Sequence, residues 1–214
     1  GLPILLPSNL MHFLEVLQFN QAEYSTWYDM LNLGFRITPT AGSDYPCVAP
    51  NLPGKERFYT RVDGSLTYNK WLESVRLGKT FVTTGPLLMF KINGKDIGEE
   101  IILDDSGYVT IEGEVLYDPE KDSVENLELI ENGRIVYSFP KLDDSGKIAF
   151  KIQRKIDESS WLALRTDRPT WSAIRASSLK KRTNAHTAPI YISVKDTPPL
   201  ASHSRTKDIA KTWL

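Results

Sequence analysis

The sequence has few of the residues that build metal sites and disulfides. Its 214 residues include one cysteine, Cys47, and three histidines, His12, His186 and His203. A single cysteine excludes an internal disulfide framework. The sequence contains no phosphate-binding loop, dinucleotide fingerprint, zinc finger or HExxH motif. The commonest local signatures of nucleotide and zinc chemistry are therefore excluded.

A strong net charge and a long apolar run are also lacking. The formal net charge is −1, which predicts no nucleic-acid partner, because nucleic-acid binding needs a strong basic field. The apolar stretch at residues 2–6 is too short for a membrane span and lacks the charged flank of a signal peptide. We therefore expect no membrane span. Because the chain begins with Gly1 and not Met, we also expect that a preceding segment has been removed.

The composition is that of a folded protein. Apolar residues make up 41% of the chain and aromatic residues 10%, which is enough for a buried core. At this length the chain can form one large domain or two small ones.

The first 50 residues predict a strand, a helix and a second strand. Residues 12–19 form an apolar run of strand length, residues 22–33 carry apolar side chains at helical spacing, and residues 34–40 favour a strand. Parallel strands joined in this way normally lie in a sheet covered on both faces. We therefore interpret residues 1–50 as the C-terminal remnant of an α/β barrel or of an open sheet.

The rest of the chain divides into a connector, a β-rich domain and a tail. Residues 51–86 predict a connector with one strand, at 57–62, and one helix, at 67–77. Residues 87–197 predict a β-sandwich, and residues 198–214 a loose tail.

Turn signals identify the sandwich. Asn93-Gly94 and Asn132-Gly133 are two-residue hairpin signals between alternating segments. Further strand candidates lie at 109–117, 148–156, 161–165 and 190–194. Short strands with frequent turns are typical of an immunoglobulin-like antiparallel β-sandwich, and the lack of a cysteine pair excludes the antibody type. The predicted fold class is α+β, mostly β, with this sandwich preceded by the partial α/β segment.

Asp44 is the first candidate for a functional residue. It follows the second predicted strand in the segment Gly42-Ser43-Asp44, and catalytic groups gather at the C-terminal ends of strands in α/β barrels. A carboxylate there can bind a divalent cation. The alternative is an ordinary Asx turn before Pro46. Glu15 either points into the barrel interior or lies at a strand edge.

His186 opens a predicted strand after a polar loop, where a lone histidine is more often a structural hydrogen-bonding residue than a ligand or a base. Ser43 and Ser172 have no evident His and Asp partners, so nucleophilic catalysis is not indicated.

Two further groups of side chains could bind ligands. Arg57 could form an anion site with Arg76, Arg165 and Arg175, or these could be scattered surface arginines. Trp71, Trp161 and Trp171 could form an exposed platform for a sugar, although aromatic residues more often fill cores.

Several segments, taken in order, resemble one family. They are residues 27–36, 41–44, 53–59, 77–86, 161–165 and 185–191, which include Ala41-Gly42-Ser43-Asp44 and Ala185-His186-Thr187-Ala188-Pro189. Between about residues 12 and 194 the chain resembles the C-terminal half of a CehA/McbA-like metallohydrolase. This family is a branch of the polymerase and histidinol phosphatase (PHP) superfamily.

The resemblance implies a distorted α/β barrel with a centre of divalent Zn, Mn or Fe, followed by a β-rich domain. Such enzymes hydrolyse phosphoesters or other ester-like bonds through a metal-activated water. Their ligands are histidines and acidic residues, beginning with an N-terminal His-x-His pair. That pair is missing from this sequence, and Pro46 stands where the later Asp-x-His motif has its histidine. Only Asp44 is therefore carried over as a metal ligand.

We therefore expect a C-terminal fragment of a metal-dependent hydrolase that binds no metal by itself and is not catalytic alone. Its sandwich would shape or cover the barrel active site. Its partner would be the missing N-terminal part of the barrel, and the exposed remnant could also form a homodimer. The alternative is a carbohydrate- or protein-binding sandwich module with no catalytic role, or a structural accessory domain without a ligand. The sequence does not fix a compartment, although a periplasmic or secreted location is favoured.

Overall fold

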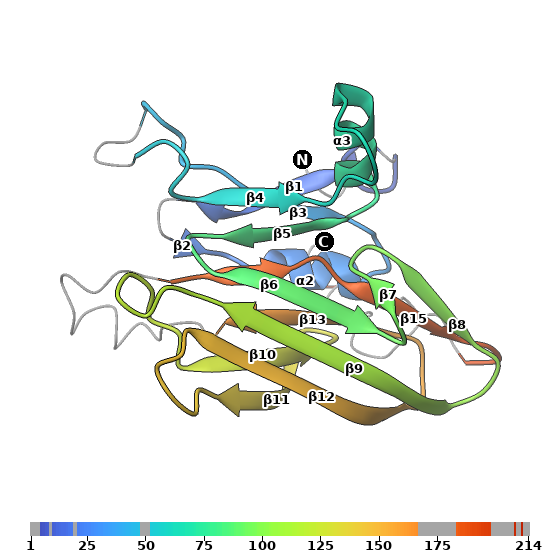
Figure 1. The fold of residues 1–214 in the computed structure, drawn as a ribbon. Helices are drawn as coiled ribbons and strands as arrows, with labels where there is room; N and C mark the ends of the chain where they lie inside the picture. Colours follow the sequence, from blue (N-terminus) through green and yellow to red (C-terminus); the bar gives the residue numbers. More distant parts are fainter. Residues whose placement is uncertain are drawn as a thin grey trace.

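The computed structural model describes residues 5–8, 10–18, 21–47, 52–166 and 183–197, together with Asp208 and Lys211. This part of the chain is mostly β with two helices, as the predicted α+β class requires. Its strands form sheets of three, eight and four strands (Figure 1). None of its helices is long and apolar enough to cross a membrane.

The N-terminal part is a β-α-β unit. Strand β1 (Phe13–Gln18) pairs in parallel with β3 (Thr38–Ala41), and α2 (Ser25–Asn32) connects them. The short strand β2 (Gln21–Ala22) adds to the end of β1 in the antiparallel direction. The helix stops before Gly34, which adopts a φ of 88° that favours glycine. The predicted parallel unit is thus present, with a shorter helix and second strand than expected.

The eight-stranded sheet forms the centre of the molecule. Its main path runs in the order β11-β10-β13-β14-β5-β4, and β15 pairs with β13 and with β8. The strands are β4 (Arg57–Thr60), β5 (Thr80–Thr83), β8 (Glu100–Leu103), β10 (Asn126–Glu131), β11 (Arg134–Pro140), β13 (Ser160–Thr166), β14 (Ala185–Thr187) and β15 (Ile190–Val194). The pairs are antiparallel except for β8 with β15.

The four-stranded antiparallel sheet has the order β12-β9-β6-β7. It consists of β6 (Leu87–Ile92), β7 (Lys95–Asp96), β9 (Gly107–Leu116) and β12 (Lys147–Ile156). Buried and exposed residues alternate along β6, as expected for a strand with one covered face. The main core lies between this sheet and the eight-stranded sheet, with Phe90 and Ile111 on one side and Leu129 and Leu164 on the other. The two sheets therefore form a β-sandwich, and its immunoglobulin-like topology stays a prediction.

The opposite face of the eight-stranded sheet is covered by α2. Trp27 and Leu31 belong to a second core cluster with Val82, Ile130 and Trp161. The indole of Trp161 also donates to the side-chain oxygen of Asn32 at 2.9 Å. The β-α-β unit is thus fixed to the sandwich by a shared core and not by a linker alone.

Both predicted hairpins form. Asn93 and Gly94 have φ values of 48° and 78°, and Asn132 and Gly133 have 49° and 80°. Two successive positive φ values are typical of type I′ turns, for which the Asn-Gly pair is preferred.

The connector differs from the expectation. Residues 52–86 contain two strands, not one, because β5 forms in addition to β4, and both belong to the eight-stranded sheet. Between them lies α3 (Tyr68–Arg76), whose first turn is capped by the Thr67 hydroxyl. The predicted tail lies outside the described residues except for Asp208 and Lys211.

Candidate functional site

Glu15 and Asp44 come together at the parallel pair of strands. Glu15 lies in β1 opposite Thr40 of β3, and Asp44 follows β3 by three residues. The carboxylate of Glu15 lies directly over the loop after β3, because a Cβ on Gly42 would be only 2.4 Å from its Oε1 atom. Partial burial raises the pKa of Glu15, and the negative charge of Asp44 raises it further. The two carboxylates therefore interact across the loop.

The side chain of Asp44 is exposed and is not used in a turn. Its φ of 51° is left-handed, and its backbone carbonyl accepts from the Cys47 amide at 2.9 Å. An Asx turn needs the amide two residues later, and Pro46 has no N–H to donate. The carboxylate is therefore available to a ligand from solvent.

Two carboxylates are a donor set that can bind a divalent cation. Oxygen ligands of this kind suit Mg²⁺, Ca²⁺ or Mn²⁺ and are also found on Zn²⁺. Within the part of the chain that is described, no group of three or more His, Cys, Asp or Glu side chains could hold a metal ion. A closed coordination sphere would need ligands beyond Glu15 and Asp44.

His186 lies far from solvent in the second core. Its exposed fraction is 0%, its Nε2 atom lies 2.5 Å from the Tyr28 hydroxyl, and its Nδ1 atom lies 2.8 Å from the Thr187 carbonyl oxygen. The carbonyl can only accept, so Nδ1–H donates to it and Nε2 accepts from Tyr28. Burial lowers the pKa of His186 to about 3, with a further contribution from the nearby positive charge of Arg165. This geometry is that of a neutral, structural histidine.

Arg165 forms a shielded ion pair beside this histidine. Its Nε and Nη2 atoms donate to Oε2 of Glu128 at 2.8 and 2.6 Å, and the two side chains are only 12% and 11% exposed. Its Nη1 atom lies 3.4 Å from the Tyr28 hydroxyl. No local spacing in the sequence links Arg165 to Glu128, because 37 residues separate them.

Arg57 stabilises its own turn. Its Nη1 atom donates to the carbonyl of Gly54 at 2.9 Å, and its Nε atom donates to the Tyr59 hydroxyl at 3.1 Å. Arg57 and Arg165 do not form a joint anion site, since each has other partners, and Arg175 lies outside the described residues.

Trp71 and Trp161 do not form an exposed platform. Trp161 is 0% exposed within the second core, and Trp71 is partly buried with its ring 6.0 Å from that of Phe58. Trp171 lies outside the described residues. The large apolar surface of Trp161 packs against α2, which is the more common role of aromatic residues in a fold.

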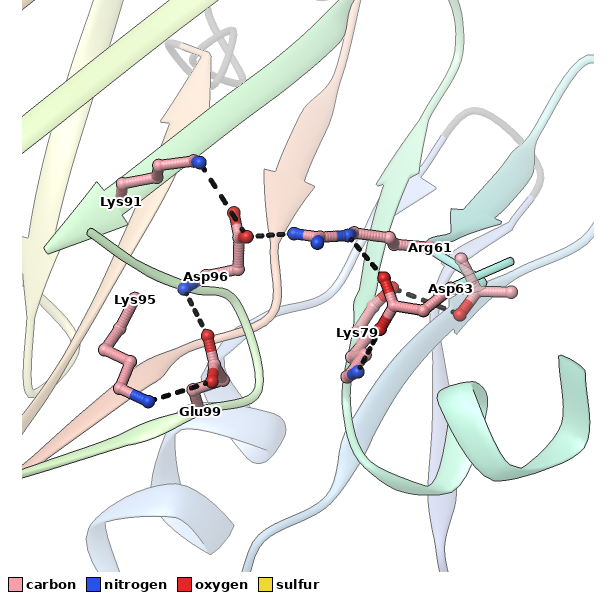
Figure 2. A network of polar contacts seen from close by, with 8 residues as sticks. Arg61, Asp63, Lys79, Lys91, Lys95, Asp96 and Glu99 are labelled. Atoms are coloured by element: carbon pink, nitrogen blue, oxygen red, sulfur yellow. Dashed lines mark hydrogen bonds and ion pairs between the residues drawn. The ribbon is translucent and has the colours of Figure 1, made fainter. Parts of the chain in front are cut away.

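A cluster of charged residues forms that the sequence did not predict. Arg61 and Asp63 follow β4, Lys79 precedes β5, and Asp96 ends β7 (Figure 2). Arg61 and Asp96 are 35 residues apart, so no local spacing could indicate their contact.

Comparison of the chain with protein-family models, curated proteins and solved structures gave no match.

Proposed function

We propose that this chain is the C-terminal part of a metal-dependent hydrolase of the PHP type. In the intact protein, Glu15 and Asp44 would contribute oxygen ligands to a divalent metal centre of Zn, Mn or Fe. The remaining ligands would come from an N-terminal part of the barrel. The chain alone is not catalytic.

The observation that carries the proposal is the pair of carboxylates on the parallel unit. Glu15 and Asp44 belong to neighbouring parallel strands or the loop directly after them. In α/β barrels the functional groups come from the C-terminal ends of such strands, which is where the loop of Asp44 lies. Glu15 lies within β1, and its carboxylate reaches the same loop. A metal held there would lower the pKa of a bound water and so supply the nucleophile for hydrolysis.

The uncovered surface around β1 is a second support. Phe13 is 54% exposed, and Leu10, which precedes the strand, is 70% exposed. Strands in parallel sheets are normally covered on both faces, and exposed apolar surface of this kind marks an interface. Further barrel strands packed on β1 would bury both side chains.

The sandwich would act as an accessory domain in this arrangement. Its central sheet packs against α2, the helix that connects β1 to β3. This contact would fix the orientation of the two strands that carry Glu15 and Asp44.

The proposal is tested on the product of the complete reading frame that encodes this chain. Hydrolysis of p-nitrophenyl phosphate and naphthyl acetate is measured with Mn²⁺, Zn²⁺ or Fe²⁺. Asp44→Ala and Glu15→Gln should each lower kcat/KM by about 100-fold or more, because each removes a ligand from the metal. Asp104→Asn is the matched control, since Asp104 is an exposed carboxylate, 85% accessible and paired with Lys195. Full activity in the Asp44 and Glu15 variants would refute the proposal.

The same surface predicts self-association of the isolated chain. Without the rest of the barrel, a second copy can cover Phe13 and Leu10. Size-exclusion chromatography with light scattering should show a concentration-dependent dimer that Phe13→Asp reduces. A clean monomer at high concentration would contradict this partner assignment.

A further inference from the structure

A cleft lies where the edge of the eight-stranded sheet meets the four-stranded sheet. It has a volume of about 410 Å³ and is bounded by the ends of β4 and β5 on one side and by β6 and β7 on the other. It lies on other strands than Glu15 and Asp44. The charged network of Figure 2, apart from Lys95, lines both sides of this cleft, and the contact of Arg61 with Asp96 joins the two sides.

The positive and negative charges that line the cleft are equal in number. The cleft is lined by three cationic side chains, Arg61, Lys79 and Lys91, and by three carboxylates, Asp63, Asp96 and Glu99. An anion would meet the carboxylates and a cation would meet the basic groups, so the lining favours an uncharged ligand.

The charged side chains that line the cleft also present hydrogen-bond donors and acceptors side by side. The Nε atom of Arg61 donates to Asp63 and its Nη1 atom donates to Asp96, so the two N–H groups of Nη2 can still donate to a ligand. Both Arg61 and Lys91 contact the Oδ2 atom of Asp96, so its Oδ1 atom can still accept (Figure 2). Lys79 holds Asp63 at 3.0 Å with one of the three donors on its ammonium. A hydroxyl group both donates and accepts, and two adjacent hydroxyls would match this pattern.

The other part of the lining is aromatic. Tyr59 and Phe81 face each other across β4 and β5, with ring centroids 5.2 Å apart and planes inclined by 21°. Tyr59 is 43% exposed, and Arg57 holds its hydroxyl at 3.1 Å. The ring is thus fixed in place while part of it faces solvent.

From these observations we propose that the cleft binds a neutral saccharide. The apolar C–H face of a sugar ring would pack on Tyr59, and its hydroxyls would bridge Arg61 and Asp96. Small-molecule sites commonly combine such an apolar surface with a few fixed polar groups. This proposal is independent of the proposed hydrolase function, because it uses none of the residues near Glu15 and Asp44.

The test is a titration of the 214-residue chain with neutral oligosaccharides. Amide shifts in NMR spectra and calorimetry are recorded with cello-, xylo-, manno- and malto-oligosaccharides, and with glucuronate and glucosamine as charged probes. At least one neutral sugar should bind with a Kd on the order of 10 μM to 1 mM. The shifted amides should cluster in β4, β5, β6 and β7.

Three variants distinguish a binding role from a structural one. Tyr59→Ala should weaken binding about tenfold or more. Tyr68→Ala is the matched control, because Tyr68 is 73% exposed on α3 and does not line the cleft. Asp96→Asn keeps the shape but removes one negative charge, so it should weaken binding of the neutral sugar and strengthen binding of glucuronate. Unchanged circular dichroism and Tm establish that each variant is folded.

The proposal is overturned if no neutral sugar in the panel binds, or if a charged probe binds the unmodified chain more tightly. It is also overturned if folded Tyr59→Ala binds as well as the unmodified chain. A loss of activity in the hydrolase assay would leave these results unchanged.

Discussion

Lowering the pH from about 7.5 to about 5 is expected to destabilise the protein through His186. In the folded chain its imidazole is buried between the Tyr28 hydroxyl and the Thr187 carbonyl, close to Arg165. Protonation would remove the acceptor that Nε2 offers to Tyr28 and would place a charge beside a guanidinium in the core. In the unfolded chain the imidazole can be protonated without losing a buried hydrogen bond and without a charge next to Arg165.

The sign and the size of the change in the free energy of unfolding follow from the pKa values of His186 in the folded and unfolded states. The folded pKa of about 3 lies below the ordinary value of 6.5, so between these values the unfolded state binds more protons than the folded state. The contribution of His186 to stability is complete above pH 6.5, falls as the pH decreases, and levels off below about pH 3. At about 1.4 kcal/mol for each pH unit, the free energy of unfolding should lose about 2 kcal/mol by pH 5.

Urea unfolding, followed by the fluorescence of the buried tryptophans Trp27 and Trp161, measures this loss. His186→Asn lacks the imidazole and should lose about 2 kcal/mol less than the unmodified chain over the same pH range. His12→Asn is the matched control, because His12 is exposed. Equal losses in the unmodified chain and in His186→Asn would refute the assignment of a buried, neutral His186.

Other expected outcomes concern the ion pair, the turns and activity. Glu128→Ala leaves Arg165 buried without its partner and should cost about 3–5 kcal/mol in urea unfolding, whereas the double change Glu128→Leu with Arg165→Met should cost less; a larger cost for the double variant would contradict this. Gly98→Ala should cost about 2–4 kcal/mol, because its φ is 81° and the added Cβ would lie 2.3 Å from the Leu77 carbonyl oxygen. Gly94→Ala is the control, because Gly94 has a similar φ of 78° but open space around it, and it should cost only about 1 kcal/mol. Equal costs for the Gly98 and Gly94 variants would contradict the expected clash with the Leu77 carbonyl. The isolated chain should not hydrolyse p-nitrophenyl phosphate or naphthyl acetate with added Mn²⁺ or Zn²⁺, and metal-dependent turnover would overturn this expectation.

Local chemistry made part of the fold predictable. The pairs Asn93-Gly94 and Asn132-Gly133 determine their own backbone conformation, because each residue tolerates positive φ. The helical spacing of Trp27, Tyr28 and Leu31 likewise identifies the face of α2 that packs on the central sheet.

The strand β5 shows where local chemistry is insufficient. Thr80–Thr83 is only four residues long, and its strand conformation depends on pairing with β4 and with β14, which follows about 100 residues later. Short strands of this kind are determined by their neighbours more than by propensity. The predicted boundary at residues 86 and 87 leaves out β4 and β5, which belong to the eight-stranded sheet, for the same reason.

The candidate site was predictable only in part. Asp44 was identified because it follows a strand, and its neighbour Glu15 was recognised as a candidate without the register that brings them together. The contacts of Arg61 with Asp96 and of Arg165 with Glu128 join residues 35 and 37 positions apart. Such contacts depend on the packing of whole sheets, and no regular spacing of residues in the sequence indicates them.

The metal content of the intact protein tests the central proposal most directly. The product of the complete reading frame and the isolated chain are each loaded with Mn²⁺, Zn²⁺ or Fe²⁺, desalted, and analysed by plasma mass spectrometry. We expect near-stoichiometric metal in the intact protein, a clear loss in Asp44→Ala, and background metal in the isolated chain. Background metal in the intact protein, or full metal in its Asp44→Ala variant, would contradict the assignment of Asp44 to a metal centre.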